Sequence, residues 1–102
     1  MRRAAKTDSN QVEIVKAFRK IGASVQILSA VGKGCPDVLV GFRGVNVLVE
    51  IKDGEKAPSA QALTADQRKW HAAWNGQVCV ANSIEEAVVK VIRTADGRLT
   101  AT

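Results

Sequence analysis

The first regular pattern in the chain is a stripe of apolar residues spaced three and four apart: Ile14, Val15, Phe18 and Ile21. This spacing is typical of one face of an α-helix, so it predicts a helix over residues 10–21. At the start of this helix, Asn10 is followed three residues later by Glu13, which resembles a capping box. The pattern therefore predicts one amphipathic helix near the N-terminus.

Two more helices, at residues 64–74 and 83–94, are predicted from their first residues. Thr64 and Ser83 are both good N-cap residues, and each is followed three residues later by a Gln or a Glu. The Asn-Gly pair after residue 74 is a typical helix stop.

Runs of β-branched and apolar residues predict four strands, at residues 24–31, 37–42, 45–52 and 77–81. The polar segment 53–63 separates the third strand from the second helix. The order α-β-β-β-α-β-α indicates an α/β fold in which helices flank a mixed sheet. We expect one domain at residues 10–94, with a basic N-terminal arm at residues 1–9 and a C-terminal tail at residues 95–102.

Length and composition are those of a single globular domain. The chain has 102 residues, of which 46% are hydrophobic and 25% charged, which excludes a disordered tail and a disulfide scaffold. Cys35, Cys79 and the single His71 do not have the spacing of a zinc site. There is no secretory segment, and no apolar run approaches the roughly 20 residues of a membrane helix, so we expect a cytoplasmic protein.

The charge balance indicates the kind of partner. Lys and Arg number 15 against 10 Asp and Glu, so the net charge is +5, which fits a polyanion such as nucleic acid. Aromatic residues make up 4% of the chain and Tyr is absent, which argues against a stacking platform for single-stranded bases.

The most informative segment is residues 36–52, which reads as a hairpin. A two-residue turn at positions 43–44 would pair the strands so that Asp37 falls directly opposite Glu50. Because side chains alternate between the two faces of a strand, one face of the hairpin is then entirely apolar. Lys52 shares the other face with the two carboxylates.

Two opposed carboxylates repel each other unless a cation lies between them. Oxygen ligands of this kind suit Mg²⁺ or Mn²⁺, and the Lys52 ammonium could polarise a phosphate or act on a water molecule. Together with the basic surface, the cluster indicates hydrolysis of a phosphodiester. A plainer interpretation is a structural salt bridge between Glu50 and Lys52, with Asp37 as a turn residue.

These residues resemble a known signature. Pro36-Asp37 followed by Glu50-Ile51-Lys52 is similar to the PD-(D/E)xK nuclease motif. Two longer segments resemble the VRR-NUC (virus-type replication-repair nuclease) branch of these nucleases: GKGCPDVLVGFRGVNVLVEIKDG and LTADQRKWHAAWNGQVCVANSIEEAV. The resemblance covers about residues 10–92 and implies a restriction-endonuclease-like core. Stand-alone members of this branch are short and often encoded by phages.

The resemblance implies a role for each matching residue. Asp37 and Glu50 would hold a divalent metal ion, Mg²⁺ or Mn²⁺, helped by the backbone carbonyl of Ile51, and Lys52 would act on the attacking water. Glu13 matches the first-helix glutamate that is expected near the metal.

Gln67 matches a glutamine on the second helix that would approach and steady the site. Both Glu13 and Gln67 could instead be capping-box residues. For Gln67, with Thr64, we expect the two roles to compete, since one amide cannot face both ways.

The implied function is metal-dependent cleavage of DNA, with structure specificity for branched substrates such as Holliday junctions or flaps in replication, recombination or repair. Isolated viral-type domains of this branch are expected to work as homodimers without an organic cofactor. The alternative is a non-catalytic module of the same fold that binds branched DNA, and a weaker one is a metal-independent interaction protein.

Four basic residues could contact nucleic acid: Lys33, Lys56, Arg68 and Lys69. For Lys33, between two glycines, simple solvation is the favoured interpretation.

Trp70 and Trp74 favour a core or a dimer interface over base stacking. His71 could be a general base, but its neighbours favour a surface or an interface. Cys35 has no histidine placed to activate it and is interpreted as a small apolar filler.

Overall fold

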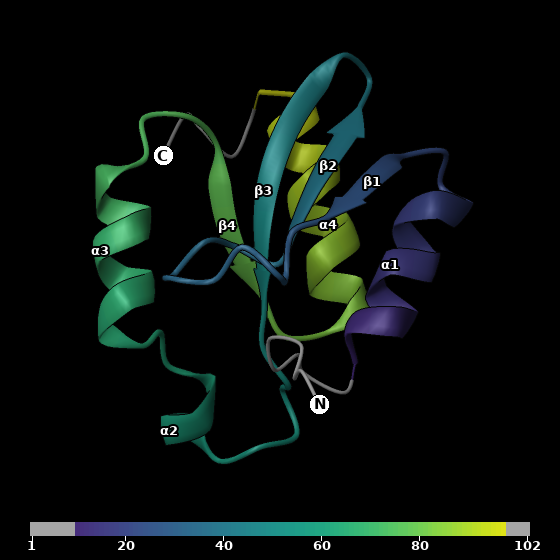
Figure 1. Cartoon of the computed structure of the whole chain (residues 1–102). Helices are drawn as coiled ribbons and strands as arrows, with labels where there is room; N and C mark the ends of the chain where they lie inside the picture. The colour runs from purple at the N-terminus through teal and green to yellow at the C-terminus, as the bar shows by residue number, and fades with distance from the viewer. Residues whose placement is uncertain (1–9, 98–102) are drawn as a thin grey trace.

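The protein folds around a four-stranded sheet with helices on both of its faces (Figure 1). The structure is a computed structural model and describes residues 10–97. Its elements are α1 (Gln11–Lys20), β1 (Ser24–Ile27), β2 (Val38–Phe42), β3 (Val45–Ile51), α2 (Pro58–Gln61), α3 (Ala65–Ala73), β4 (Val78–Ala81) and α4 (Ile84–Ala95). None of the described helices has the length and apolar character needed to cross a membrane.

The sheet is mixed, with the strands in the order β1-β2-β3-β4. Strand β2 is antiparallel to both of its neighbours, β1 and β3, whereas β3 and β4 are parallel. Parallel neighbours require a crossover, which α2 and α3 supply between β3 and β4. The strand that bears the predicted motif, β3, is therefore paired on both sides.

The predicted hairpin register is confirmed. Phe42 pairs with Val45, and Val38 pairs with Val49 at the other end of the ladder. The turn between them has positive φ angles at both Arg43 (53°) and Gly44 (79°), as two-residue hairpin turns commonly require.

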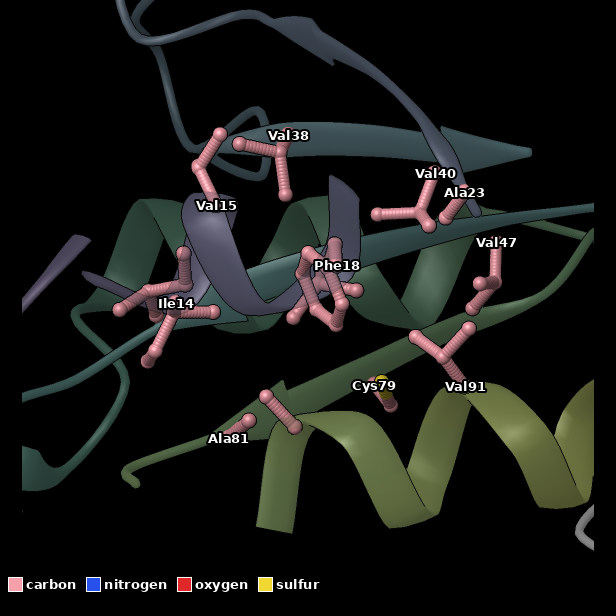
Figure 2. Packing of buried hydrophobic residues seen from close by; sticks show 13 residues of the cluster. Ile14, Val15, Phe18, Ala23, Val38, Val40, Val47, Cys79, Ala81 and Val91 are labelled. Atoms are coloured by element: carbon pink, nitrogen blue, oxygen red, sulfur yellow. The ribbon is translucent and has the colours of Figure 1, made fainter. Parts of the chain in front are cut away.

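The hydrophobic core lies between one face of the sheet and the helices α1 and α4. Figure 2 shows Ile14 and Phe18 of α1 and Val91 of α4 packed among strand residues, and Phe18 is completely buried. The apolar face of the hairpin supplies the other side of this core, with Val38, Val40, Val47, Val49 and Ile51 all buried. The predicted division of the hairpin into an apolar face and a polar face is therefore correct.

Two elements differ from the prediction. The first strand ends at Ile27 and not at residue 31, because the chain turns there and the Val31 amide donates to the Leu28 carbonyl. The polar segment 53–63 contains the short helix α2, which begins with Pro58 at its first position. Residues 1–9, the predicted basic arm, and residues 98–102 of the predicted tail lie outside the described part of the chain.

The caps of the helices were predicted with mixed success. Thr64 and Ser83 both accept a hydrogen bond from the backbone amide three residues later, as expected. The capping box at Asn10 and Glu13 is wrong, because the Asn10 side chain makes no cap bond. Its Nδ2 donates instead to the backbone carbonyls of Lys52 (3.0 Å) and Asn82 (3.4 Å), so Asn10 ties the start of α1 to the end of β3.

The variant Phe18→Ala should lower the free energy of unfolding by about 3–5 kcal/mol, because it leaves a large cavity in a closed core. Val12→Ala, on the same helix but at a side chain that is 63% exposed, should change it by less than about 0.5 kcal/mol. Urea denaturation followed by circular dichroism measures both values. Equal effects at the two positions would contradict the packing of α1 on the sheet.

Candidate functional site

The polar residues of the predicted motif lie at the end of β3, on the face opposite the core. Glu50 and Lys52 alternate with Val49 and Ile51, so the two polar side chains turn away from α1 and α4. Both are nevertheless buried, with side chains that are 4% and 9% exposed. Charged groups are rarely buried to this extent without compensation from a partner.

The compensation comes from Gln67 in the first turn of α3. The Lys52 Nζ donates to Gln67 Oε1 at 2.8 Å, and Gln67 Nε2 donates to Glu50 Oε2 at 3.0 Å. The ammonium and the carboxylate themselves are 4.0 Å apart. One amide therefore bridges two opposite charges and holds each side chain in a defined position.

Gln67 also completes the capping box of α3. Its side-chain Oε1 accepts from the Thr64 backbone amide at 2.9 Å, and the backbone amide of Gln67 donates to Thr64 Oγ1 at 3.2 Å. The expectation that capping and a site role would compete is wrong, because an amide oxygen has two lone pairs and accepts from both Thr64 and Lys52. The cap thus fixes the position of the amide that organises the site.

Asp37 lies directly before β2, next to the carboxylate-bearing strand. Its Oδ2 accepts from the Ile51 amide at 2.7 Å, and its own amide donates to the Val49 carbonyl at 3.1 Å. The Asp37 side chain is thus turned toward the end of β3 that carries Glu50.

Cys35 lies in the loop directly before Asp37 and is half-buried. Burial raises the pKa of its thiol, and the negative charges of Glu50 and then Asp37 raise it further. The raised pKa of the Cys35 thiol fits its interpretation as an inert filler.

The loop between β1 and β2 reaches across to the start of α3 (Figure 1). Gly34 has a φ of 88°, and a Cβ atom at this position would collide with the backbone carbonyl of Asp66. This position therefore requires glycine on two grounds, conformation and space. Lys33, also with a positive φ of 56°, is exposed on the same loop.

His71 joins the site although the sequence analysis favoured a surface or an interface for it. It lies one helical turn after Gln67 and is half-buried, and its Nε2 atom is buried with no hydrogen-bond partner among residues 10–97. Burial lowers the pKa of His71, and the positive charge of Lys52 lowers it further. The spacing of four from Gln67 was the available signal, because residues i and i+4 share a helix face.

Glu13 is not brought together with the other residues. Its side chain is 61% exposed on α1 and faces Lys16, with 3.8 Å between Glu13 Oε2 and Lys16 Nζ. Within residues 10–97, no group of three or more His, Cys, Asp or Glu side chains is close enough to hold a metal ion. The expected first-helix ligand is thus absent from the cluster in this structure.

The four predicted nucleic-acid contacts are all exposed: Lys33, Lys56, Arg68 and Lys69. Arg68 is partly engaged, since its Nη1 donates to the Leu63 carbonyl at 2.8 Å. The exposure of these four side chains is compatible with contact to a polyanion.

Trp70 and Trp74 stack on each other, with ring centroids 4.7 Å apart. Trp74 is 46% exposed, and no residue of α3 is buried, so this helix does not form part of the core. The core alternative for Trp74 is therefore wrong, and the dimer interface stays a prediction. The Gln67 side chain connects α3 to the end of β3 through its hydrogen bonds to Lys52 and Glu50.

The donor set can hold a hard cation. Asp37 and Glu50 offer carboxylate oxygens at one end of the hairpin, and the Ile51 carbonyl lies between Glu50 and Lys52 in the chain. Mg²⁺ is commonly bound by one or two carboxylates, with waters and substrate phosphate completing its shell, so a pair of carboxylates is sufficient. These ligands are all oxygen atoms, whereas zinc sites are built mainly from His and Cys.

Comparison with known proteins tests the predicted fold and the resemblance to the VRR-NUC branch. No protein family model and no curated protein matches the chain. A solved structure of a VRR_NUC domain does match, with a TM-score of 0.60 and 26% sequence identity, over 83% of this chain and 97% of the other. The chain has the fold of a VRR_NUC domain. The resemblance and the α/β fold class with a restriction-endonuclease-like core are confirmed, and the VRR_NUC match indicates a nuclease-type domain.

Gln67→Ala should lower the free energy of unfolding by about 2 kcal/mol or more. The variant removes one half of a capping box and leaves two buried charged groups without their shared partner. Gln26→Ala is the matched control, because the Gln26 side chain is exposed and bonds only locally, to the Ile27 carbonyl. Thermal unfolding compares the two variants, and a Gln67→Ala protein as stable as the control would contradict the bridging role.

Proposed function

We propose that this protein is a divalent-metal-dependent endonuclease that hydrolyses DNA phosphodiester bonds, with specificity for branched DNA such as Holliday junctions or flaps. The observation that carries the proposal is the buried cluster of Glu50, Lys52 and Gln67, with Asp37 turned toward the same end of β3. Burial of two charged side chains to this extent is unfavourable for folding, so the presence of Glu50 and Lys52 here favours a functional role for them.

In this proposal, Asp37 and Glu50 hold Mg²⁺ or Mn²⁺ with the help of the Ile51 carbonyl. The bound ion would lower the pKa of a water molecule and offset phosphate charge. Lys52, held by Gln67, places a positive charge where negative charge develops on the phosphate, and it orients the attacking water. Gln67 keeps Glu50 and Lys52 at their separation while the substrate binds.

Branched DNA and a homodimer are the finer parts of the proposal. They rest on the VRR-NUC resemblance, together with a net charge of +5 and the exposed basic residues Lys33, Arg68 and Lys69. A two-fold dimer would suit a four-way junction, which presents two equivalent strands.

A non-catalytic module that binds branched DNA is the competing function. A pair of carboxylates near the bound backbone would weaken phosphate binding unless a cation offsets them. The acidic pair therefore favours the enzyme, and the experiment below separates the two.

Labelled four-way junction, flap and linear duplex should be cleaved with Mg²⁺ or Mn²⁺ and left intact in EDTA. Lys52→Ala and Glu50→Gln should each lower the cleavage rate by about 100-fold or more, because each removes a charged group at the reacting centre. Lys20→Ala, at an exposed residue on the far helix α1, should cleave like the unmodified protein. Circular dichroism verifies that each variant is folded, and binding without cleavage under every metal would favour the binding module.

Lys33→Gln and Lys69→Gln should weaken DNA binding and each lower the slope of log affinity against log salt by about 1. The physical reason is that each lysine releases counterions when it meets a phosphate. Fluorescence anisotropy at several salt concentrations, without divalent metal, measures the slopes. Lys20→Gln serves as the control, and slopes equal to that control would remove the two lysines from the DNA surface.

A further inference from the structure

His71 is a half-buried residue that the proposed mechanism does not use, and its Nε2 atom is fully buried. It lies on the side of α3 that carries Gln67, four residues earlier, and its Nε2 has no hydrogen-bond partner within residues 10–97. Buried polar atoms without a partner are uncommon in folded proteins and call for an explanation. The explanation that we consider starts from the position of His71, one helical turn after the Gln67 side chain that accepts a hydrogen bond from Lys52.

The surrounding charges define the environment of the ring. Lys52, at the end of β3, is the charged group whose field acts on His71, while Glu50 and Asp37 act on Cys35. Burial and the Lys52 charge both favour the neutral imidazole. A protonated ring would put a second positive charge beside an ammonium that is itself 9% exposed and poorly screened by water.

Building on the proposed nuclease function, we propose that His71 is a positioning residue for Lys52. In this proposal the uncharged ring lies beside the lysine side chain. The ammonium then keeps its hydrogen bond to Gln67 Oε1 and its 4.0 Å separation from Glu50 Oε2. Protonation of the ring repels the ammonium from this position and so disorganises the site. His71 does not touch the scissile phosphate in this arrangement and acts through Lys52.

The coupling has a direction that can be measured without any catalysis. Lys52 lowers the proton affinity of His71, so removal of the lysine charge must raise it. The repulsion acts equally on both groups, so a protonated His71 ring drives the Lys52 ammonium away from its native position. Cleavage should therefore decline as the pH falls through the pKa of His71, which lies below the usual value of about 6.5.

The first test is an NMR titration of His71, without metal or DNA. His71 is the sole histidine, so its ring signals are unambiguous. Lys52→Met should raise the pKa of His71 toward the value of an unperturbed imidazole, whereas Lys20→Met on α1 should leave it unchanged. An unchanged pKa in Lys52→Met would overturn the proposal, and this result does not depend on whether the protein cleaves DNA.

The second test is the pH dependence of cleavage. For the unmodified protein, the rate should fall on the acidic side with a midpoint that matches the measured pKa of His71. His71→Gln, which cannot titrate, should lose this step and be about 10–100-fold slower at neutral pH at saturating DNA, with DNA affinity unchanged. Ala72→Gln, an exposed change on the same helix, should behave like the unmodified protein.

Two outcomes separate the two proposals. Absence of cleavage by the unmodified protein with every metal and substrate would overturn the nuclease function and leave the titration to decide the coupling between His71 and Lys52. Cleavage by His71→Gln with the same rate and the same acidic step as the unmodified protein would overturn the positioning role alone.

Discussion

The bridge made by the Gln67 amide is the interaction on which the candidate site depends. Glu50 and Lys52 are buried side chains of opposite charge, and their 4.0 Å separation is too long for a direct hydrogen bond. Gln67 donates to Glu50 and accepts from Lys52, so each charged group has a hydrogen-bond partner while the two stay apart. This separation leaves the ammonium and the carboxylate as two distinct groups, each with its own chemistry, in a place from which water is largely excluded.

The fold prepares this bridge from two directions. The hairpin register brings Asp37 beside the end of β3, and the parallel pairing with β4 extends to Ile51 and Ala81. From the other direction, Thr64 fixes the first turn of α3 and with it the Gln67 side chain. A local capping motif and a long-range strand pairing therefore converge on the same few atoms, which is the consistency between levels that specifies a structure.

Much of this was accessible from the sequence. Alternation of apolar and polar residues from Val38 to Ile51 set the hairpin register and the face of the motif, because a one-residue slip would have buried the polar face. The same alternation predicts the positions of the two carboxylates and Lys52. The position of Glu13 could not be predicted in this way, because a helix start favours glutamate whether or not a metal is near. The direction in which Glu13 points depends on the rotation of α1 on the sheet, which packing determines. The role of His71 depends on how α3 sits over β3, which the local pattern does not encode.

The core lies on one side of the sheet and the candidate site on the other. None of the residues of α3 is buried, so this helix does not take part in the packing of α1 and α4 against the sheet. Mutations on the outer surface of α3 therefore carry little penalty in folding free energy. Proteins diversify most readily where stability and activity are borne by different parts of the structure. In this small domain, the outer surface of α3 is free to vary during evolution, and new substrate preferences can arise there without a matching change in the hydrophobic interior.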